Sequence, residues 1–189
     1  MKHFLRLAQN LDILPLLYAL HRQPWLFDAD RTRTAFPGSP HAQVHDILLR
    51  FSAVPEYVTA GGVPVTDDVH ESVPMPAWWA LPEAHPLVFT LFAAVRGTRL
   101  GRVMITRLDP GMQIPPHIDS KAQTDYYQRF HVTLAAPQWA CVFQIEEEQV
   151  EMRPGDCWSV NNAVLHGVTN DGDESRLSLI CDIHSDSAP

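Results

Sequence analysis

The amino-acid sequence predicts a mainly β fold, built as an antiparallel sandwich or barrel. From Gly101 onward, short apolar runs alternate with turn signals such as Asp-Pro-Gly and Arg-Pro-Gly-Asp, and strands at this spacing are typical of all-β architectures. Proline is also abundant, with 16 residues against 9 glycines. Because prolines spread through a chain shorten helices and multiply turns, they favour the same class of fold.

The length of 189 residues favours a single domain that spans residues 1–189 and buries a sizeable core. Within it we expect a helical and loop-rich N-terminal part, residues 1–100, packed on a core barrel, residues 101–184.

Periodicity in the N-terminal part indicates its individual elements. Apolar residues at approximately helical spacing predict one or two helices over residues 3–21 and another over about residues 87–95. The run HDILLRFSA predicts a strand at 45–53. Residues 28–41 mix charges with Pro, Gly and Ser, which predicts an exposed or active-site loop, and the proline-rich stretch 54–86 predicts a long irregular connection.

Composition excludes several classes of partner and location. With 22 acidic and 14 basic residues the net charge is −8, so we expect no nucleic-acid partner. No apolar stretch approaches the roughly 18 residues of a membrane span, and polar residues interrupt the apolar N-terminus, so we expect neither a membrane partner nor a signal peptide. Three cysteines without a Cys-x-x-Cys pair suit a reducing compartment, which predicts a cytoplasmic protein.

His117 and Asp119 stand two residues apart in the segment GMQIPPHID. On an extended strand this spacing places both side chains on one face, where an imidazole nitrogen and a carboxylate oxygen can converge on one metal ion at about 2 Å. Chance and surface pairing also produce His-x-Asp pairs, so the pair alone is weak evidence for a metal site.

His166 supplies a third candidate ligand, after a tight Pro-Gly turn and a short strand in RPGDCWSVNNAVLHGVTN. This arrangement recurs in double-stranded β-helix proteins, the jelly-roll or cupin-like barrels, in which a later strand returns a ligand to the same mouth. The 47 residues from Asp119 to His166 leave room for that return. Two histidines and one carboxylate with open positions form the facial triad that holds non-haem Fe(II).

Arg176 follows His166 by ten residues, in ESRLSLICDI. Strand alternation gives Arg176 and Ser178 one face, where a guanidinium and a hydroxyl could grip a carboxylate inside the barrel. Alternation alone favours an outward Arg176 in solvent, because a buried arginine needs an anionic partner. Combined with the triad, the inward orientation is preferred.

On the strand RFHVTL, Arg129 and His131 share one face. Turned into the same cavity, they would supply positive charge for a second carboxylate. The alternative interpretation makes His131 a core histidine with satisfied hydrogen bonds.

Four segments together resemble the aspartyl/asparaginyl β-hydroxylase family of Fe(II)- and 2-oxoglutarate-dependent oxygenases: TRLDPGMQIPPHID, RFHVTL, the RPGD…NNAVLHGVTN block and RLSLICDI. They cover about residues 105–182. The resemblance implies three Fe(II) ligands, which are His117, Asp119 and His166. It implies that the distal carboxylate of 2-oxoglutarate binds Arg176 together with Thr106, which lies on the strand before the Asp-Pro-Gly turn, and that the metal-chelating end lies near Arg129 and His131. Ser178, on the same strand face as Arg176, is a further candidate cosubstrate-binding residue.

The implied reaction couples O₂-dependent decarboxylation of 2-oxoglutarate, to succinate and CO₂, with hydroxylation of an amino acid, a peptide residue or a related small molecule. Loops 28–41 and 57–79 would close on that substrate. Candidates to line the substrate site are Arg50, Trp78, Trp79, Tyr126 and Tyr127. For each of them a structural role is the stronger interpretation, because aromatic residues usually pack in the core.

Two other classes of function stay open from sequence. One is a cupin-type metal-binding protein or isomerase that does not use 2-oxoglutarate. Such a protein does not require Arg176 and more often presents a His-x-His start with a later Glu. The other is a barrel that keeps its fold as a binding module without metal.

Overall fold

The computed structural model describes residues 1–35, 37–52 and 68–186. Eleven strands are assigned in these ranges: β1 Phe4–Ala8, β2 Val44–Ser52, β3 Ser72–Pro74, β4 Arg99–Leu108, β5 Gln113–His117, β6 Gln128–Ala135, β7 Cys141–Ile145, β8 Glu148–Val150, β9 Cys157–Val160, β10 His166–Asn170 and β11 Arg176–His184. The helices are α1 Leu14–Arg22, α2 Pro76–Ala80, α3 His85–Ala94 and α4 Lys121–Thr124, with short 3-10 turns at Pro24–Leu26 and Pro82–Ala84.

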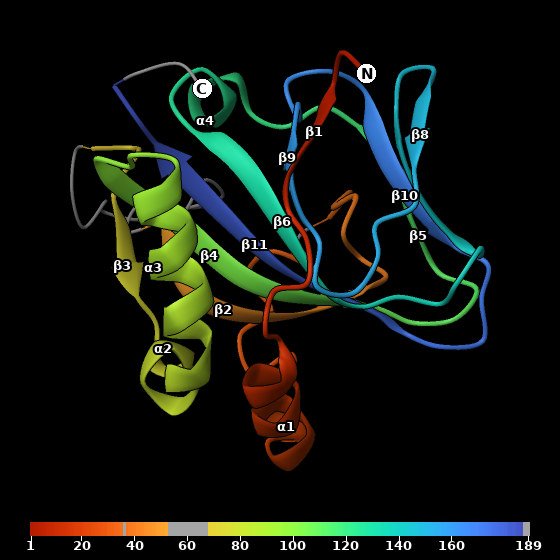
Figure 1. Ribbon diagram of the computed structural model, residues 1–189, viewed down its shortest axis with the longest axis horizontal. Coiled ribbons are helices and arrows are strands. Elements are labelled where there is room, and N and C mark those ends of the chain that lie inside the picture. The colour runs from red at the N-terminus through yellow and green to blue at the C-terminus, as the bar shows by residue number, and fades with distance from the viewer. Residues whose placement is uncertain (36, 53–67, 187–189) are drawn as a thin grey trace.

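The strands form two antiparallel sheets. The larger has the order β1-β9-β6-β11-β4-β2-β3, and the smaller has the order β5-β10-β7-β8. Figure 1 shows helices α1, α2 and α3 on one side of the large sheet and the small sheet on the other. The prediction of a mainly β, double-stranded β-helix barrel with N-terminal helices packed on it is confirmed.

Both faces of the large sheet are covered, one by the helices and the other by the small sheet. The face toward the helices is apolar, whereas the face toward the small sheet carries both apolar and polar side chains. One core lies between the helices and the sheet and includes Leu16, Val88 and Ile105. A second core lies between the two sheets and includes Phe143 and Trp158. In β11, the odd positions 177–183 therefore pack toward the helices, and the even positions from 176 face the other way, toward the barrel interior.

The prediction of helix across residues 3–21 is wrong for its first part. Residues Phe4–Ala8 form β1, which pairs antiparallel with β9, and α1 begins only at Leu14. Phe4 is buried edge-on against Phe143 and Trp158, so burial in the second core overrides the local helical spacing. Asn10, with a φ of 58°, then turns the chain before α1.

The N-terminal part also contains more strand than predicted. The strand expected at 45–53 is β2 and the helix expected at 87–95 is α3, each shifted by one or two residues. The connection expected at 54–86 contains β3, α2 and a 3-10 turn after residue 67, and its first part lies outside the described residues. With β1, the part at 1–100 contributes three strands to the large sheet.

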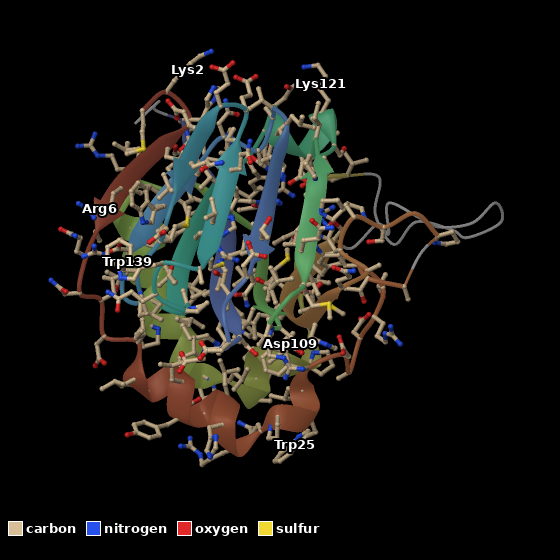
Figure 2. The ribbon with its side chains drawn as sticks, turned by 90° about the vertical axis from the view of Figure 1, so that its right-hand side faces the viewer. Lys2, Arg6, Trp25, Asp109, Lys121 and Trp139 are labelled. Atoms are coloured by element: carbon tan, nitrogen blue, oxygen red, sulfur yellow. The ribbon has the colours of Figure 1, made fainter. Side chains whose placement is uncertain are left out.

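Figure 2 looks onto the small sheet and shows Asp109 and Lys121, which flank β5 in sequence, toward opposite ends of the strands. Strand β5 runs from the Asp109 end to the Lys121 end, so its last residue, His117, lies toward the latter. None of the described helices is long and apolar enough to cross a membrane.

Candidate metal centre

The antiparallel pairing of β5 with β10 brings His117 and His166 together. The two residues are register partners, and their ring centroids are 4.3 Å apart. Asp119 follows β5 directly, and its Oδ1 lies 3.4 Å from His117 Nε2 and 4.0 Å from His166 Nε2. Three donor atoms from two strand ends thus face one point.

Hydrogen bonds orient both imidazole rings in the same way. His117 Nδ1 lies 2.9 Å from the Pro115 carbonyl, and His166 Nδ1 lies 2.9 Å from the Val164 carbonyl. Because a carbonyl only accepts, each Nδ1 carries the proton and each Nε2 keeps its lone pair. His117 Nε2 is buried and has no hydrogen-bond partner among the described residues. Ligand histidines are commonly fixed in this manner, so the donor set fits a metal ion.

Asp119 is fixed through its other oxygen. Oδ2 accepts hydrogen bonds from Asn162 Nδ2, at 2.7 Å, and from Arg129 Nη1. Burial alone would raise the pKa of Asp119, but Arg129, with help from the two histidines and Asn162, holds this pKa well below its ordinary value. The carboxylate is therefore ionised and presents Oδ1 to the centre.

Arg129 is held between two carboxylates. Its Nε and Nη2 donate to the two oxygens of buried Asp182, at 2.8 and 2.9 Å, while Nη1 reaches Asp119. The structure thus places Arg129 at the metal centre as a positioning group for Asp119. Its contact with the chelating end of a cosubstrate stays a prediction.

Arg176 is buried inside the barrel with 3 % of its surface exposed, the orientation that the sequence favours only in combination with the triad. Its Nη2 has no hydrogen-bond partner in the described part of the chain, and the same holds for Ser178 Oγ, Thr133 Oγ1 and His131 Nδ1. Native interiors rarely leave polar atoms unsatisfied. Four of them on the inner face of β6 and β11 indicate a polar ligand.

These four groups lie across neighbouring strands. Ser178 is the register partner of Thr133 on β6 and of Thr106 on β4. The predicted Thr106 is therefore placed beside Ser178, and it is buried. Hydroxyl groups from three adjacent strands line one wall of the interior.

The Phe143 ring lies between Arg176 and the candidate metal ligand His166. The ring lies 5.8 Å from the Arg176 guanidinium carbon, 5.2 Å from the His131 ring and 6.3 Å from the His166 ring. Burial, followed by the charges of Arg176 and Arg129, lowers the pKa of His131 well below its ordinary value. His131 is therefore neutral, and its Nδ1 has no hydrogen-bond partner among the described residues.

The family model for aspartyl/asparaginyl beta-hydroxylase matches residues 77–186, more than half of the chain. The chain belongs to this family. Its members are Fe(II)- and 2-oxoglutarate-dependent hydroxylases, so the chain is placed among enzymes of that class. No curated protein matches the chain.

Several solved structures are similar to this chain, and one of them shares its fold with a TM-score above 0.5. An oxidoreductase of the 2OG-Fe(II) oxygenase family from Burkholderia pseudomallei superimposes with a TM-score of 0.56 at 15% identity, over 97% of this chain and 84% of that one. A cupin domain from Bordetella pertussis gives 0.37 at 18% identity, over 47% of this chain and 85% of that one. A predicted oxalate decarboxylase from Thermotoga maritima has a TM-score of 0.37 at 17% identity, over 49% of this chain and 73% of that one.

The site of this hydroxylase-family chain also contains residues that sequence reasoning missed. Arg33 and His41, from the loop predicted at 28–41, line a pocket beside His117 and Asp119. One ring nitrogen of His41 lies with the ligand atoms of His117 and Asp119 in a group no more than 4.8 Å apart. Neither residue belongs to a spaced motif, so only the mixed charge of the loop signals them.

The lining residues suggested from aromatic content lie elsewhere. Trp78 stacks on His85 in the core, Trp79 is 71 % exposed and the Tyr127 hydroxyl donates to the His70 carbonyl. None of Arg50, Trp78, Trp79, Tyr126 and Tyr127 lines the pocket at the metal centre.

Proposed function

We propose that this chain is an Fe(II)- and 2-oxoglutarate-dependent dioxygenase that hydroxylates an amino acid, a peptide residue or a related small molecule, with release of succinate and CO₂. The observation that carries the proposal is the buried Arg176 guanidinium, with an unpartnered Nη2 among unpartnered hydroxyls, close to two histidines and a carboxylate whose donor atoms converge.

His117, Asp119 and His166 would hold Fe(II), which together with 2-oxoglutarate and O₂ supplies the oxidising chemistry when bound. The chain's own contribution is geometric. Backbone carbonyls fix both imidazole rings, and Asn162 with Arg129 fixes the carboxylate. The donor atoms are thereby held in place for a metal ion.

Arg176 would bind the distal carboxylate of 2-oxoglutarate. Burial lowers the pKa of the guanidinium, and the Coulombic effect of Cys141 opposes this shift. A buried arginine gains most from a carboxylate that accepts two parallel hydrogen bonds. The hydroxyls of Ser178, Thr133 and Thr106 offer further donors along the same wall.

The buried Arg176 also separates the proposal from its main alternative. A cupin-type protein that does not use 2-oxoglutarate has no need for an unpartnered arginine inside the barrel. Burying such a charge without a ligand is costly, because its hydration is lost with nothing in return. The polar interior wall therefore favours the oxygenase.

The experiment is to measure succinate formed from 2-oxoglutarate by the Fe(II)-loaded protein in air, across a panel of amino acids, peptides and other small metabolites. We expect succinate to form, with stimulation by at least one member of the panel, and we expect Asp119→Ala to abolish it. Bound Fe(II) without any succinate formation would favour the cupin-type alternative.

A further inference from the structure

A pocket of about 190 Å³ opens beside the metal centre. Its lining joins His117 and Asp119 to Arg33 and His41 of the N-terminal loop and to Arg102 on β4. The volume is below the roughly 300–1,000 Å³ of pockets for drug-sized ligands. It suits a small molecule or a single side chain.

His41 differs from the two ligand histidines in the hydrogen bond that fixes its ring. Arg33 Nη2 lies 2.9 Å from His41 Nδ1. A guanidinium can only donate, so His41 Nδ1 accepts and the proton of the neutral ring is on Nε2. In His117 and His166 the Nε2 atom has a lone pair that can bind a metal ion. In His41 the Nε2 atom carries the proton and can donate a hydrogen bond.

Arg33 is fixed from two sides. Its Nη1 donates to Oδ2 of Asp46, at 2.6 Å, and this carboxylate is buried on β2. Ser39 Oγ donates to the Arg33 carbonyl and accepts from the His41 backbone N–H, at 2.9 and 3.1 Å. The loop therefore holds Arg33 and His41 as one unit against the metal centre.

Cationic and N–H groups outnumber carboxylates in the lining of the pocket, and Asp46 and Asp182, which pair with two of the arginines, are not lining residues. Besides Arg33, the side chains of Arg102 and Arg129 lie in its lining, and Asp119 is the single carboxylate among the lining residues of the described chain. Guanidinium and imidazole N–H groups match the oxygens of a carboxylate, in charge and in hydrogen bonding.

We infer that Arg33 and His41 form a binding subsite for the carboxylate of a small acidic substrate, and that His41 is not a metal ligand. The inference rests on the proposed function, which makes the adjacent centre the place of C–H oxidation. The carboxylate could come from a free small acid or from an acidic side chain of a peptide. Both sources present the same carboxylate group, and the experiment distinguishes between them.

The test measures binding by calorimetry to the protein loaded with Fe(II) and 2-oxoglutarate under anaerobic conditions. The probes are free L-amino acids and small carboxylic acids, each paired with its primary carboxamide, and blocked peptides that contain Asp or Glu paired with Asn or Gln. We expect at least one acid to bind at least tenfold more tightly than its amide. The free-acid and peptide arms identify the source.

Variants assign that preference to the loop. Removing Arg33 alone would leave Asp46 buried and unpaired, so the informative variant is the double substitution Arg33→Gln/Asp46→Asn, with the exposed Arg31→Gln as the matched control on the same loop. We expect the ratio of the affinities for the acid and its amide to fall at least tenfold in the double variant and to stay unchanged in the control. Affinity for 2-oxoglutarate should stay within about twofold.

His41 has its own readout. His41→Leu should lower the affinity for the acid. His41→Gln, which retains an N–H donor, should recover part of that affinity. Both should keep Fe(II) affinity close to wild type, whereas a metal ligand would lose it.

Three results would overturn the inference while leaving the proposed function intact: no acid preferred over its amide, an equal effect of the Arg31 and Arg33 substitutions, or loss of Fe(II) in His41→Leu. Failure of the proposed function would look different. Succinate would not form, while calorimetry on the metal-loaded protein without 2-oxoglutarate would still decide whether acids are preferred.

Discussion

His117 and His166 face each other across the β5–β10 pairing and are bound in the same way, each through Nδ1 to the carbonyl two residues earlier in the chain. One local geometry, used on two strands, thus directs two Nε2 lone pairs to one point. Substitution of either histidine by Ala should lower Fe(II) affinity, since each removes one of the three proposed protein ligands. Anaerobic Fe(II) titration measures the change. Wild-type affinity in His166→Ala would refute its assignment as a ligand.

Close approach of the two strands depends on Gly167. A Cβ atom there would lie 2.9 Å from the Ile114 carbonyl oxygen and 3.2 Å from the Pro116 nitrogen, and backbone atoms cannot easily move away. Gly167→Ala should push β5 from β10, with a loss of about 1–3 kcal/mol in the free energy of unfolding, and should weaken Fe(II) binding. Urea unfolding and metal titration measure both effects. Leu165→Ala, at an exposed neighbour, is the control, and equal behaviour of the two variants would contradict the prediction.

Asn162 acts through Asp119. Its amide donates to Asp119 Oδ2 at 2.7 Å, and outer partners of metal ligands typically contribute about 10–100-fold in metal affinity. We expect a loss in that range for Asn162→Ala. The neighbouring Asn161→Ala is a matched control, because that side chain bonds His3 and the Ala163 backbone instead. Metal titration of the pair separates the positioning role from a general effect on the loop.

Much of the site follows from sequence, because strand alternation makes side-chain direction predictable. The even positions of β11 from Arg176 face the interior, as alternation combined with the metal-ligand pattern suggests, and His117 and Asp119 share a centre, as their spacing suggests. Contacts between segments that are far apart in the chain cannot be predicted from strand alternation. Nothing in the sequence pairs Arg129 with Asp182, and the helical spacing in residues 3–21 does not reveal that Phe4 is buried between the sheets.

The pH dependence of stability without metal follows from buried neutral histidines. Burial lowers the pKa of His166 to about 4 from 6.5, so between these values the unfolded chain binds a proton that the folded chain does not. Stability should therefore fall as pH falls from 6.5 to 4, by about 3 kcal/mol from His166 alone. His41 and His131, whose pKa values burial also lowers, act in the same direction.

Urea unfolding of the metal-free protein between pH 7 and pH 4 measures this slope. His166→Gln should reduce this slope, with the contributions of His41 and His131 remaining, and His21→Gln, at an exposed position on α1, should leave it unchanged. A flat wild-type profile over this range would contradict the burial of neutral histidines.

Arg176 gives a prediction that separates charge from geometry. Arg176→Lys keeps the charge but loses the fork that binds a carboxylate bidentately. We expect at least a tenfold loss of 2-oxoglutarate affinity, and a larger loss in Arg176→Ala, since breaking a buried pair costs about 3–5 kcal/mol. Fe(II) affinity should be nearly unchanged. Arg107→Lys, on the same sheet and paired with Asp109, is the control.

The cosubstrate site is tested most directly by anaerobic titration of the Fe(II)-loaded protein with 2-oxoglutarate, followed through the visible charge-transfer absorption of an Fe(II)-bound 2-oxo acid. We predict a saturable band in the wild type and in Arg107→Lys, and at least tenfold more 2-oxoglutarate for half-saturation in Arg176→Lys. Absence of the band in protein that holds Fe(II), or identical titrations for the two arginine variants, would contradict the proposed function and the assigned role of Arg176.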